Sequence, residues 1–116
     1  MPSLTYHLVA EPFYQDWDAS EDYTPEDYEQ DGFIHCTDGI ANVLATANRY
    51  YTDDKRHWLV LVIDKELLTA EVKYEDEEKI YPHIYGPLNR DAIVSELPVK
   101  RDDDGTFVSL ELVKLD

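Results

Sequence analysis

The chain has 116 residues and a mass of 13.5 kDa, the usual size of one domain with one hydrophobic core. Its 26 Asp and Glu residues against 10 Lys and Arg residues give a formal net charge of -16, which repels the phosphate backbone of nucleic acid. We therefore expect a single domain over residues 1–116 that binds no nucleic acid, although one local cationic site can still hold a small anionic ligand.

Targeting and redox signals are few. Hydrophobic residues make up 43% of the chain, but no apolar run approaches the roughly 20 residues of a membrane span. The N-terminus lacks the basic and then apolar pattern of a secretion signal. Because Cys36 is the single cysteine, it forms no internal disulfide. The sequence therefore predicts a cytoplasmic protein without a membrane segment.

The N-terminal third begins with a strand. Apolar and polar residues alternate over Leu4–Ala10, so His7 points away from the face that holds Tyr6 and Leu8. A short helix is expected next, since Pro12 suits a first helical turn and aromatic residues follow at positions i and i+4. The acidic segment "EDYTPEDYEQD" reads as a loop with a helical turn after Thr24.

The stretch "DGFIHCTDG" predicts a strand over Gly32–Thr37, enclosed by turn-forming pairs. Phe33 and His35 then share one face of this strand. We expect its neighbour in the sheet to be the strand that carries His7. Apolar residues at spacings of three and four predict a helix over Asp38–Tyr51, with its first residue as the N-cap.

The second half of the chain reads mainly as strands. The apolar run His57–Ile63 predicts a strand buried on both faces. The "DDDG" sequence marks a hairpin turn between two late strands. Several strands, mostly late, with two early helices indicate an α+β domain rather than a doubly wound one. The other predicted strands are Ala70–Tyr74 and segments within Ile80–Leu88, Ala92–Val99 and Phe107–Leu112.

The histidines are the residues most suggestive of a site. His57 follows "DDKR" at a strand entry, where exposure to solvent explains it. His7, His35 and His83 instead lie in or beside strands, among aromatic and apolar neighbours. One such histidine alone is most simply structural, with its nitrogens bonded to the backbone. Three together indicate a shared pocket, in which each imidazole finds a partner.

Three chemistries could use these imidazoles. A zinc site is disfavoured, because no HxH, HExxH or CxxC spacing occurs and His35 and Cys36 alternate to opposite faces of one strand. Cysteine–histidine catalysis is disfavoured, because the strand position of Cys36 favours a buried, inert thiol. A pocket in which imidazoles bond the hydroxyls or phosphates of a nucleotide-like molecule needs only convergence across strands. We therefore expect no metal and a small nucleotide-like ligand.

The segments "YHLV", "DGFIHCTD" and "YPHIYGPLN", in this order and at these separations, resemble the hallmark segments of a mostly bacterial family, domain of unknown function number nine-fifty-two. The resemblance covers nearly the whole chain. It implies a compact ADP-ribosyltransferase-like fold, with a split, mainly antiparallel sheet and helices packed at its sides. Within that fold the chain is most similar to the RNA 2'-phosphotransferase branch.

The resemblance also implies roles for single residues. Carried over by position, His7 and His35 line a cleft for NAD as the candidate catalytic pair. His7 would bond a ribose hydroxyl, and His35 a phosphate or the group that attacks the nicotinamide-bearing ribose carbon. The candidate ligand-binding residues are Thr37, His83, Tyr85 and Arg90.

Two departures from the related transferases keep alternatives open. No motif places their late catalytic glutamate, and a solvated strand face explains both Glu96 and Glu111. Outside "DDKR", the arginines available for a phosphate are Arg49, Arg90 and Arg101. The chain is thus an NAD-dependent transferase of this type, a non-catalytic module that binds a metabolite or a protein, or a structural protein. Its oligomeric state and biological process are not determined by the sequence.

Overall fold

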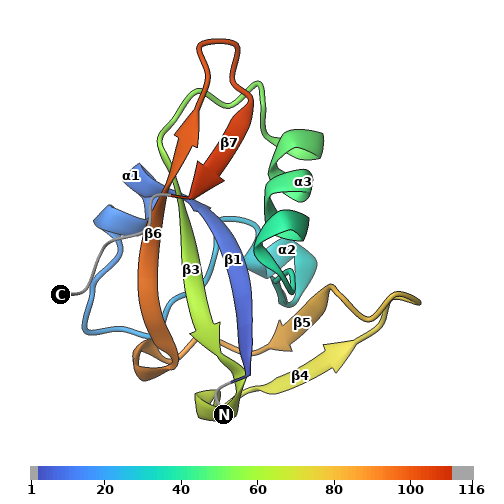
Figure 1. Cartoon of the computed structure of the whole chain (residues 1–116). Coiled ribbons are helices and arrows are strands. Elements are labelled where there is room, and N and C mark those ends of the chain that lie inside the picture. The colour runs from blue at the N-terminus through green and yellow to red at the C-terminus, as the bar shows by residue number, and fades with distance from the viewer. Residues whose placement is uncertain (1–2, 111–116) are drawn as a thin grey trace, which may run out of the picture.

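The computed structural model describes residues 3–110, and its largest element is a four-stranded antiparallel sheet (Figure 1). The strands lie in the order β1, β3, β6, β7, so that β1 and β7 form the two edges. Their bounds are Leu4–Ala10 (β1), Trp58–Asp64 (β3), Ile93–Arg101 (β6) and Phe107–Leu110 (β7).

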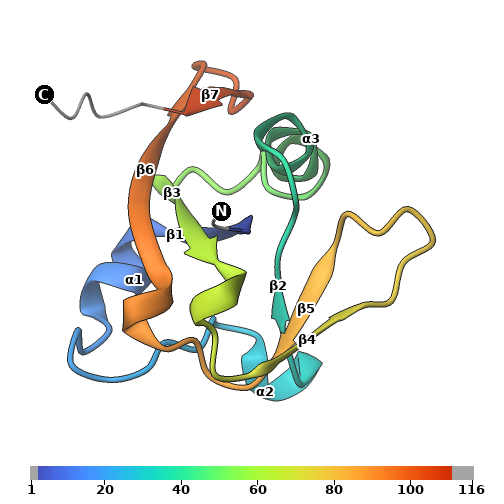
Figure 2. The same cartoon turned by 60° about the horizontal axis from the view of Figure 1, so that its bottom comes forward.

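A second, smaller sheet lies beside the first one. It is also antiparallel, in the order β2, β5, β4, with bounds Ile34–His35, Pro82–Tyr85 and Glu71–Tyr74. The α-helices are α1 (Glu11–Asp16), α2 (Tyr28–Asp31) and α3 (Ile40–Tyr50), and short 3-10 turns cover Lys65–Leu67 (η1) and Arg90–Ala92 (η2). Figure 2 shows the chain passing from α2 through β2 to α3. The protein is therefore an α+β protein, as its sequence pattern predicts.

The predicted elements match the observed ones within a few residues, apart from one strand. β1 has the predicted bounds, and the other predicted strands each contain or overlap an observed one. The strand expected over Gly32–Thr37 is reduced to Ile34–His35, since Gly32 ends α2 with a left-handed φ of 81°. Residues 111 and 112 of the last predicted strand lie outside the described residues.

The expected pairing of the His35 strand with the His7 strand is wrong. β2 pairs with β5, in the register Ile34 with Ile84, and both isoleucines are fully buried. Towards β1 the same segment makes only the bridge between Tyr6 and Thr37. Burial of the isoleucine pair directs β2 onto the small sheet, so the bridge between Tyr6 and Thr37 is the backbone pairing of this segment with the large sheet.

The core is divided by β3, whose residues from Trp58 to Ile63 are all buried. One face of β3 contributes Leu59, Leu61 and Ile63 to a cluster with β2, β5 and the aromatic residues of the N-terminal loops. The other face contributes Trp58 to a cluster that includes Ala47 of α3. The prediction of a strand buried on both faces is confirmed. Because the two clusters pack on opposite faces of the large sheet, β1 lies between α3 and the small sheet.

The start of α3 differs from the prediction. The N-cap is Gly39, with a φ of 89° and no side-chain cap, rather than Asp38. The Asp38 carboxylate instead accepts a hydrogen bond of 2.6 Å from the Tyr74 hydroxyl. The same carboxylate lies 3.6 Å from the Lys65 ammonium, so Asp38 ties the start of α3 to β4 and to η1.

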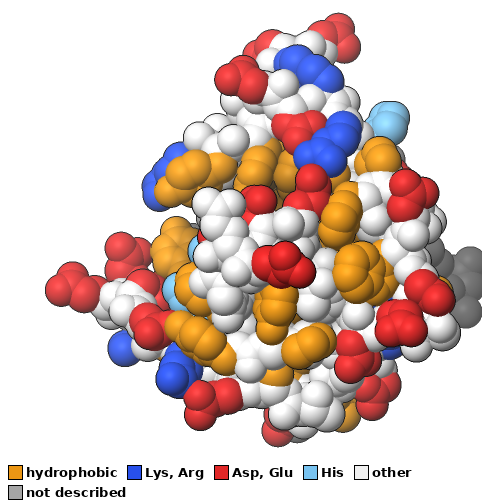
Figure 3. Space-filling view, turned by 180° about the vertical axis from the view of Figure 1, so that it is seen from behind, with side chains coloured by type: hydrophobic (Ala, Val, Ile, Leu, Met, Phe, Trp, Pro, Cys, Tyr) orange, Lys and Arg blue, Asp and Glu red, His pale blue; other side chains and the backbone are white. Residues whose placement is uncertain are grey.

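The surface reflects the acidic composition. Figure 3 shows Asp and Glu side chains spread around one face, with apolar side chains between them and cations at only a few points. Among the described residues, no helix is long and apolar enough to cross a membrane.

Candidate functional site

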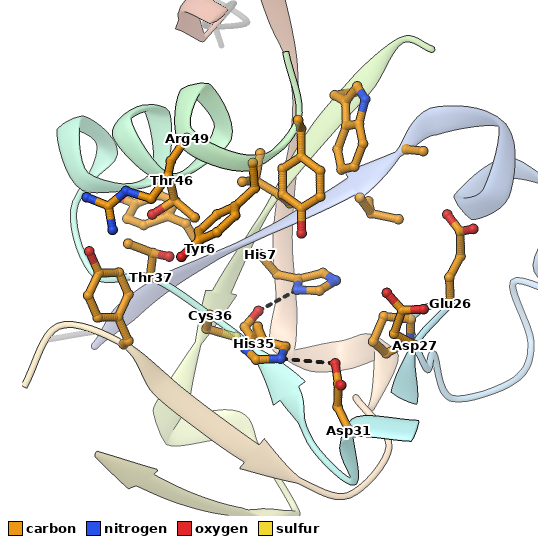
Figure 4. A pocket seen from close by; sticks show the side chains of 18 of the residues that line it. Tyr6, His7, Glu26, Asp27, Asp31, His35, Cys36, Thr37, Thr46 and Arg49 are labelled. Atoms are coloured by element: carbon orange, nitrogen blue, oxygen red, sulfur yellow. Dashed lines mark hydrogen bonds and ion pairs between the residues drawn. The ribbon is translucent and has the colours of Figure 1, made fainter. Parts of the chain in front are cut away.

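A cavity of about 610 Å³ runs along the outer edge of β1 (Figure 4). This volume lies within the range of about 300–1,000 Å³ that is usual for small-molecule sites. Its walls come from β1, the segment from Tyr23 to Asp31, the strand and loop from His35 to Thr37, and the C-terminal half of α3. The cavity therefore occupies the place where the two sheets separate.

The edge of β1 offers free backbone groups to this cavity. Tyr6 exchanges both of its backbone hydrogen bonds with Thr37, at 3.0 and 2.8 Å. Hydrogen-bonding direction alternates along an antiparallel strand, and the register of β1 with β3 is continuous. The N–H and C=O of Leu8, two residues after Tyr6, therefore point to the same side, where no strand lies among the described residues.

His7 is buried and held by two partners. Its Nδ1 lies 2.6 Å from the His35 carbonyl oxygen, and its Nε2 lies 3.1 Å from the Tyr23 hydroxyl. Because a carbonyl only accepts, Nδ1 carries the proton and Nε2 accepts from Tyr23. Desolvation by burial lowers the pKa of His7 to about 4. His7 is thus a neutral imidazole that positions the His35 backbone and the Tyr23 hydroxyl.

His35 contrasts with His7, because its side chain is 61% exposed. Its Nε2 lies 3.0 Å from an Asp31 carboxylate oxygen, while Nδ1 has no protein partner within residues 3–110. The rings of Phe33 and His35 lie on one face of the strand, as predicted, with centroids 4.8 Å apart. His35 therefore presents one free ring nitrogen at the cavity.

His83 extends this histidine and aromatic cluster across the small sheet. It lies directly opposite His35 in the register of β2 with β5, and its ring stacks on Phe33 with centroids 4.0 Å apart. Its Nδ1 lies 3.2 Å from a Glu75 carboxylate oxygen, which also accepts a hydrogen bond from the Tyr85 hydroxyl. His83 lines the cavity, whereas Tyr85 lies behind it on the same sheet face.

Of the two other residues predicted to bind the ligand, one lines the cavity and one does not. Thr37 lines the cavity and is 5% exposed. Arg90 does not line it, because its guanidinium donates to the Glu21 and Asp18 carbonyls and to the Tyr14 hydroxyl. The structure thus brings together His7, His35, Thr37 and His83, and leaves Tyr85 and Arg90 outside.

Several cavity residues were not among the predicted catalytic and ligand-binding residues. Tyr23 sits in an acidic loop without a motif, and its burial becomes clear only once its hydroxyl is seen to meet His7. Arg49 stands three residues after Thr46 on α3, a spacing that places both on one helix side. The carboxylates of the lining are Glu26, Asp27, Asp31, Asp54 and Asp76.

Cysteine and metal chemistry depend on the exposure of Cys36 and on how the possible metal ligands are grouped. Cys36 is buried, as predicted, and burial raises the pKa of its thiol. A buried, protonated thiol is a poor nucleophile. Within residues 3–110, no group of three or more His, Cys, Asp and Glu side chains is arranged to hold a metal ion.

The two late glutamates considered in the sequence, Glu96 and Glu111, are not among the described lining residues. Glu96 on β6 accepts a hydrogen bond of 2.6 Å from the Tyr14 hydroxyl and lies away from the cavity. Glu111 lies outside the described residues.

Known structures share this architecture. The X-ray structure of CC0527 from Caulobacter crescentus is 23% identical to this chain, with a TM-score of 0.77, over 91% of this chain and 94% of that chain. The solution NMR structure of CC0527 is 24% identical, with a TM-score of 0.69, over 88% and 89% of the two chains. Likeness at these identities shows a common fold.

The family comparison covers most of the sequence. No curated protein matches the chain. A family model described as "Protein of unknown function (DUF952)" matches residues 8–96, a segment that includes His35, His83 and most of the cavity lining. The chain therefore belongs to the DUF952 family of proteins of unknown function.

Proposed function

We propose that the cavity binds a nucleotide of the NAD type, and that the chain is a compact ADP-ribosyltransferase-like domain whose two sheets part to admit it. The observation that carries this proposal is the free edge of β1 beside His35. At Leu8 a backbone donor and a backbone acceptor face the cavity side by side. Such a pair needs a partner when it is covered, and a ligand supplies one.

The backbone N–H and C=O of Leu8 that face the cavity are complementary to an amide group. A primary carboxamide presents an N–H donor and a C=O acceptor side by side in one plane, so it can replace the missing strand at this point. Nicotinamide carries such a group. We propose that the nicotinamide end of NAD lies against Leu8, between His7 and α3.

The histidines then have different roles. Both nitrogens of His7 are bonded within the protein, so the ligand meets the groups that His7 positions rather than His7 itself. His35 offers its free Nδ1 to a ribose hydroxyl of the ligand. Aromatic side chains of the lining provide faces for the ligand rings, namely Tyr6, Tyr50, Tyr51, Trp58 and Tyr81.

The proposal is for binding and assigns no reaction. Glu96 lies away from the cavity, so no glutamate from a late described strand is placed to orient a nucleophile. A net charge of -16 and a cavity lined by five carboxylates favour a small ligand over an RNA.

Isothermal titration calorimetry with NAD and with ADP-ribose tests the proposal. NAD should bind more tightly than ADP-ribose, because ADP-ribose lacks the carboxamide. His35→Ala should weaken NAD binding by about 1–3 kcal/mol, with an unchanged melting temperature. His57→Ala is the matched control, because it removes an exposed histidine that lies outside this cavity.

Two results would contradict the proposal. Equal affinity for NAD and ADP-ribose would show that the backbone of Leu8 does not bind the carboxamide. No binding of either ligand would favour the other expected class, a module that binds a different metabolite or a protein. A thermal-shift measurement gives an independent check, since a ligand at 100 times its dissociation constant stabilises a protein by about 2.7 kcal/mol.

A further inference from the structure

The charges around the cavity are unevenly distributed. Figure 4 shows Arg49 near Thr46, Thr37 and Tyr6 on one side, while Glu26, Asp27 and Asp31 lie on the other and the two histidines lie between. Arg56 also lines the cavity, but its guanidinium pairs with the carboxylates of Glu26 and Asp54, at 3.1 and 2.6 Å. Arg56 therefore has little attraction left for an anionic ligand.

Arg49 is different, because its side chain makes no ion pair and no hydrogen bond within residues 3–110. Its guanidinium carbon lies 5.9 Å from the centre of the Tyr50 ring, a contact that leaves the N–H donors free. Arg49 is exposed on the last turn of α3 and lines the cavity. A planar guanidinium with free donors matches the oxygens of a phosphate group.

Thr37 supplies a second, independent observation. The side chain is 5% exposed, it lines the cavity, and its hydroxyl has no hydrogen-bond partner among the described residues. A hydroxyl so deeply placed needs a partner from within the cavity. Its atoms are not among the fully enclosed polar atoms, so a ligand can reach it.

Tyr6 brings a third donor to the same place. Tyr6 and Thr37 are directly paired residues of two antiparallel segments, so their side chains lie next to each other on one face. The phenol of Tyr6 also has no hydrogen-bond partner in the described part of the chain. Arg49 and the two hydroxyls therefore converge on the end of the cavity beneath α3 (Figure 4).

We infer that Arg49, Thr37 and Tyr6 form a subsite for one phosphate group of the ligand. This inference rests on the proposed nucleotide cleft, and it fixes the direction in which the nucleotide lies. The bound phosphate lies beneath α3, and a nucleoside part of the ligand faces Glu26, Asp27 and Asp31. Because only one of the two cavity arginines is free of carboxylates, the subsite takes a single phosphate group.

The test uses inorganic phosphate alone and, separately, adenosine and adenosine 5'-monophosphate. Inorganic phosphate should shift the NMR signals of Thr37 and of the Arg49 side chain in the full-length protein. The monophosphate should bind about 10- to 100-fold more tightly than adenosine, since charge-assisted hydrogen bonds to the phosphate are gained.

Matched variants locate the effect. Arg49→Gln should abolish the preference for the monophosphate, and Lys100→Gln should keep it, because Lys100 is an exposed cation outside the cavity with the same charge. Thr37→Val should weaken monophosphate binding about fivefold or more, and Thr37→Ser should preserve it.

The outcomes separate this subsite from the proposed function. If adenosine and its monophosphate bind equally and phosphate shifts neither signal, the phosphate subsite is wrong although the nucleotide cleft stands. If neither nucleoside compound binds but phosphate shifts Thr37 in the parent protein and not in Arg49→Gln, the subsite stands and the nucleotide cleft is wrong. An Arg49→Gln protein that keeps the full preference would also overturn the inference.

Discussion

The large and the small sheet each bring a histidine to the same cavity, but they treat it in opposite ways. His7 on the large sheet is 5% exposed, and both of its nitrogens have protein partners. His35 on the small sheet has a side chain that is 61% exposed and keeps one nitrogen free. Two histidines with a common cavity therefore differ in what they contribute, because one stabilises the wall and the other faces the open cavity.

The difference comes from the depth of the two sheets. β1 lies beside β3, which is buried on both faces, and the buried ring of His7 on β1 has both nitrogens paired inside the protein. The outer face of the small sheet instead carries Phe33, His35 and His83 on a half-buried aromatic surface. Substitutions in the two sheets test this contrast.

His7→Ala should cause the largest loss, about 3 kcal/mol in the free energy of unfolding. The change leaves a cavity and removes the partners of the His35 carbonyl and the Tyr23 hydroxyl. Urea denaturation of the parent and the variant measures the difference. A loss as small as that of the exposed control His57→Ala would mean that His7 has no structural role.

Acid should reveal His7 through the pH dependence of stability. The folded protein holds the pKa of His7 near 4, below the ordinary value of 6.5, so the unfolded chain takes up the proton first as the pH falls. Stability is therefore complete above about pH 6.5 and is lost towards about pH 4, by roughly 1.5 kcal/mol between about pH 6.5 and pH 5. Below the folded pKa the loss becomes constant.

His7→Gln should remove this part of the pH dependence, because glutamine does not titrate. The difference between the two urea-denaturation series from pH 7 to pH 5 isolates His7 from the other titrating groups, which both proteins share. Parallel curves for the two proteins over this range would show that His7 does not carry the effect.

Phe33→Ala should have an intermediate effect, about 1 kcal/mol of stability. Phe33 joins the outer face of the small sheet, where its ring stacks on His83 and meets His35. Near-ultraviolet circular dichroism and urea denaturation follow the change. Phe33→Leu is the control, since it keeps an apolar side chain but loses the ring stack.

His35→Ala should have the smallest effect on stability, below about 0.5 kcal/mol, because most of the side chain is in solvent and its pair with Asp31 lies near the surface. A thermal melt of the variant beside His7→Ala measures the contrast directly. Equal losses from the two variants would show that the two sheets do not differ in the way described.

Local sequence patterns were sufficient to predict an element where its residues follow one hydrophobic periodicity. The alternation over Leu4–Ala10 gave β1 its correct bounds, although the face buried along the strand is that of Thr5, His7 and Val9 rather than that of Leu4, Tyr6 and Leu8. The apolar spacing of α3 likewise placed the helix to within two residues of its ends. The segment around His35 did not obey a local rule, since its partner is set by the burial of Ile34 against Ile84, 50 residues further along the chain.

Site residues were harder to select than elements. Arg90 was predicted to bind the ligand and Arg49 was only one of the arginines available for a phosphate, because nothing near either one in the sequence marks it as free. The fold gives Arg90 three oxygen partners from a segment about 70 residues earlier, while Arg49 keeps its donors at the cavity. Tyr85 belongs to the same sheet face as His83, yet the Glu75 carboxylate holds its hydroxyl away from the cavity.

The sequence alone determined the α+β class, most element positions, a buried thiol and three histidines in or beside strands, because periodicity and composition act over a few neighbouring residues. The tertiary structure decided which histidine nitrogens are free and where the backbone of β1 has no partner. Those properties depend on contacts over long separations, such as the bonds of His7 to residues 28 and 16 positions away. Hydrogen-bond partners at such distances are chosen by how the sheets pack, and no local pattern records that choice.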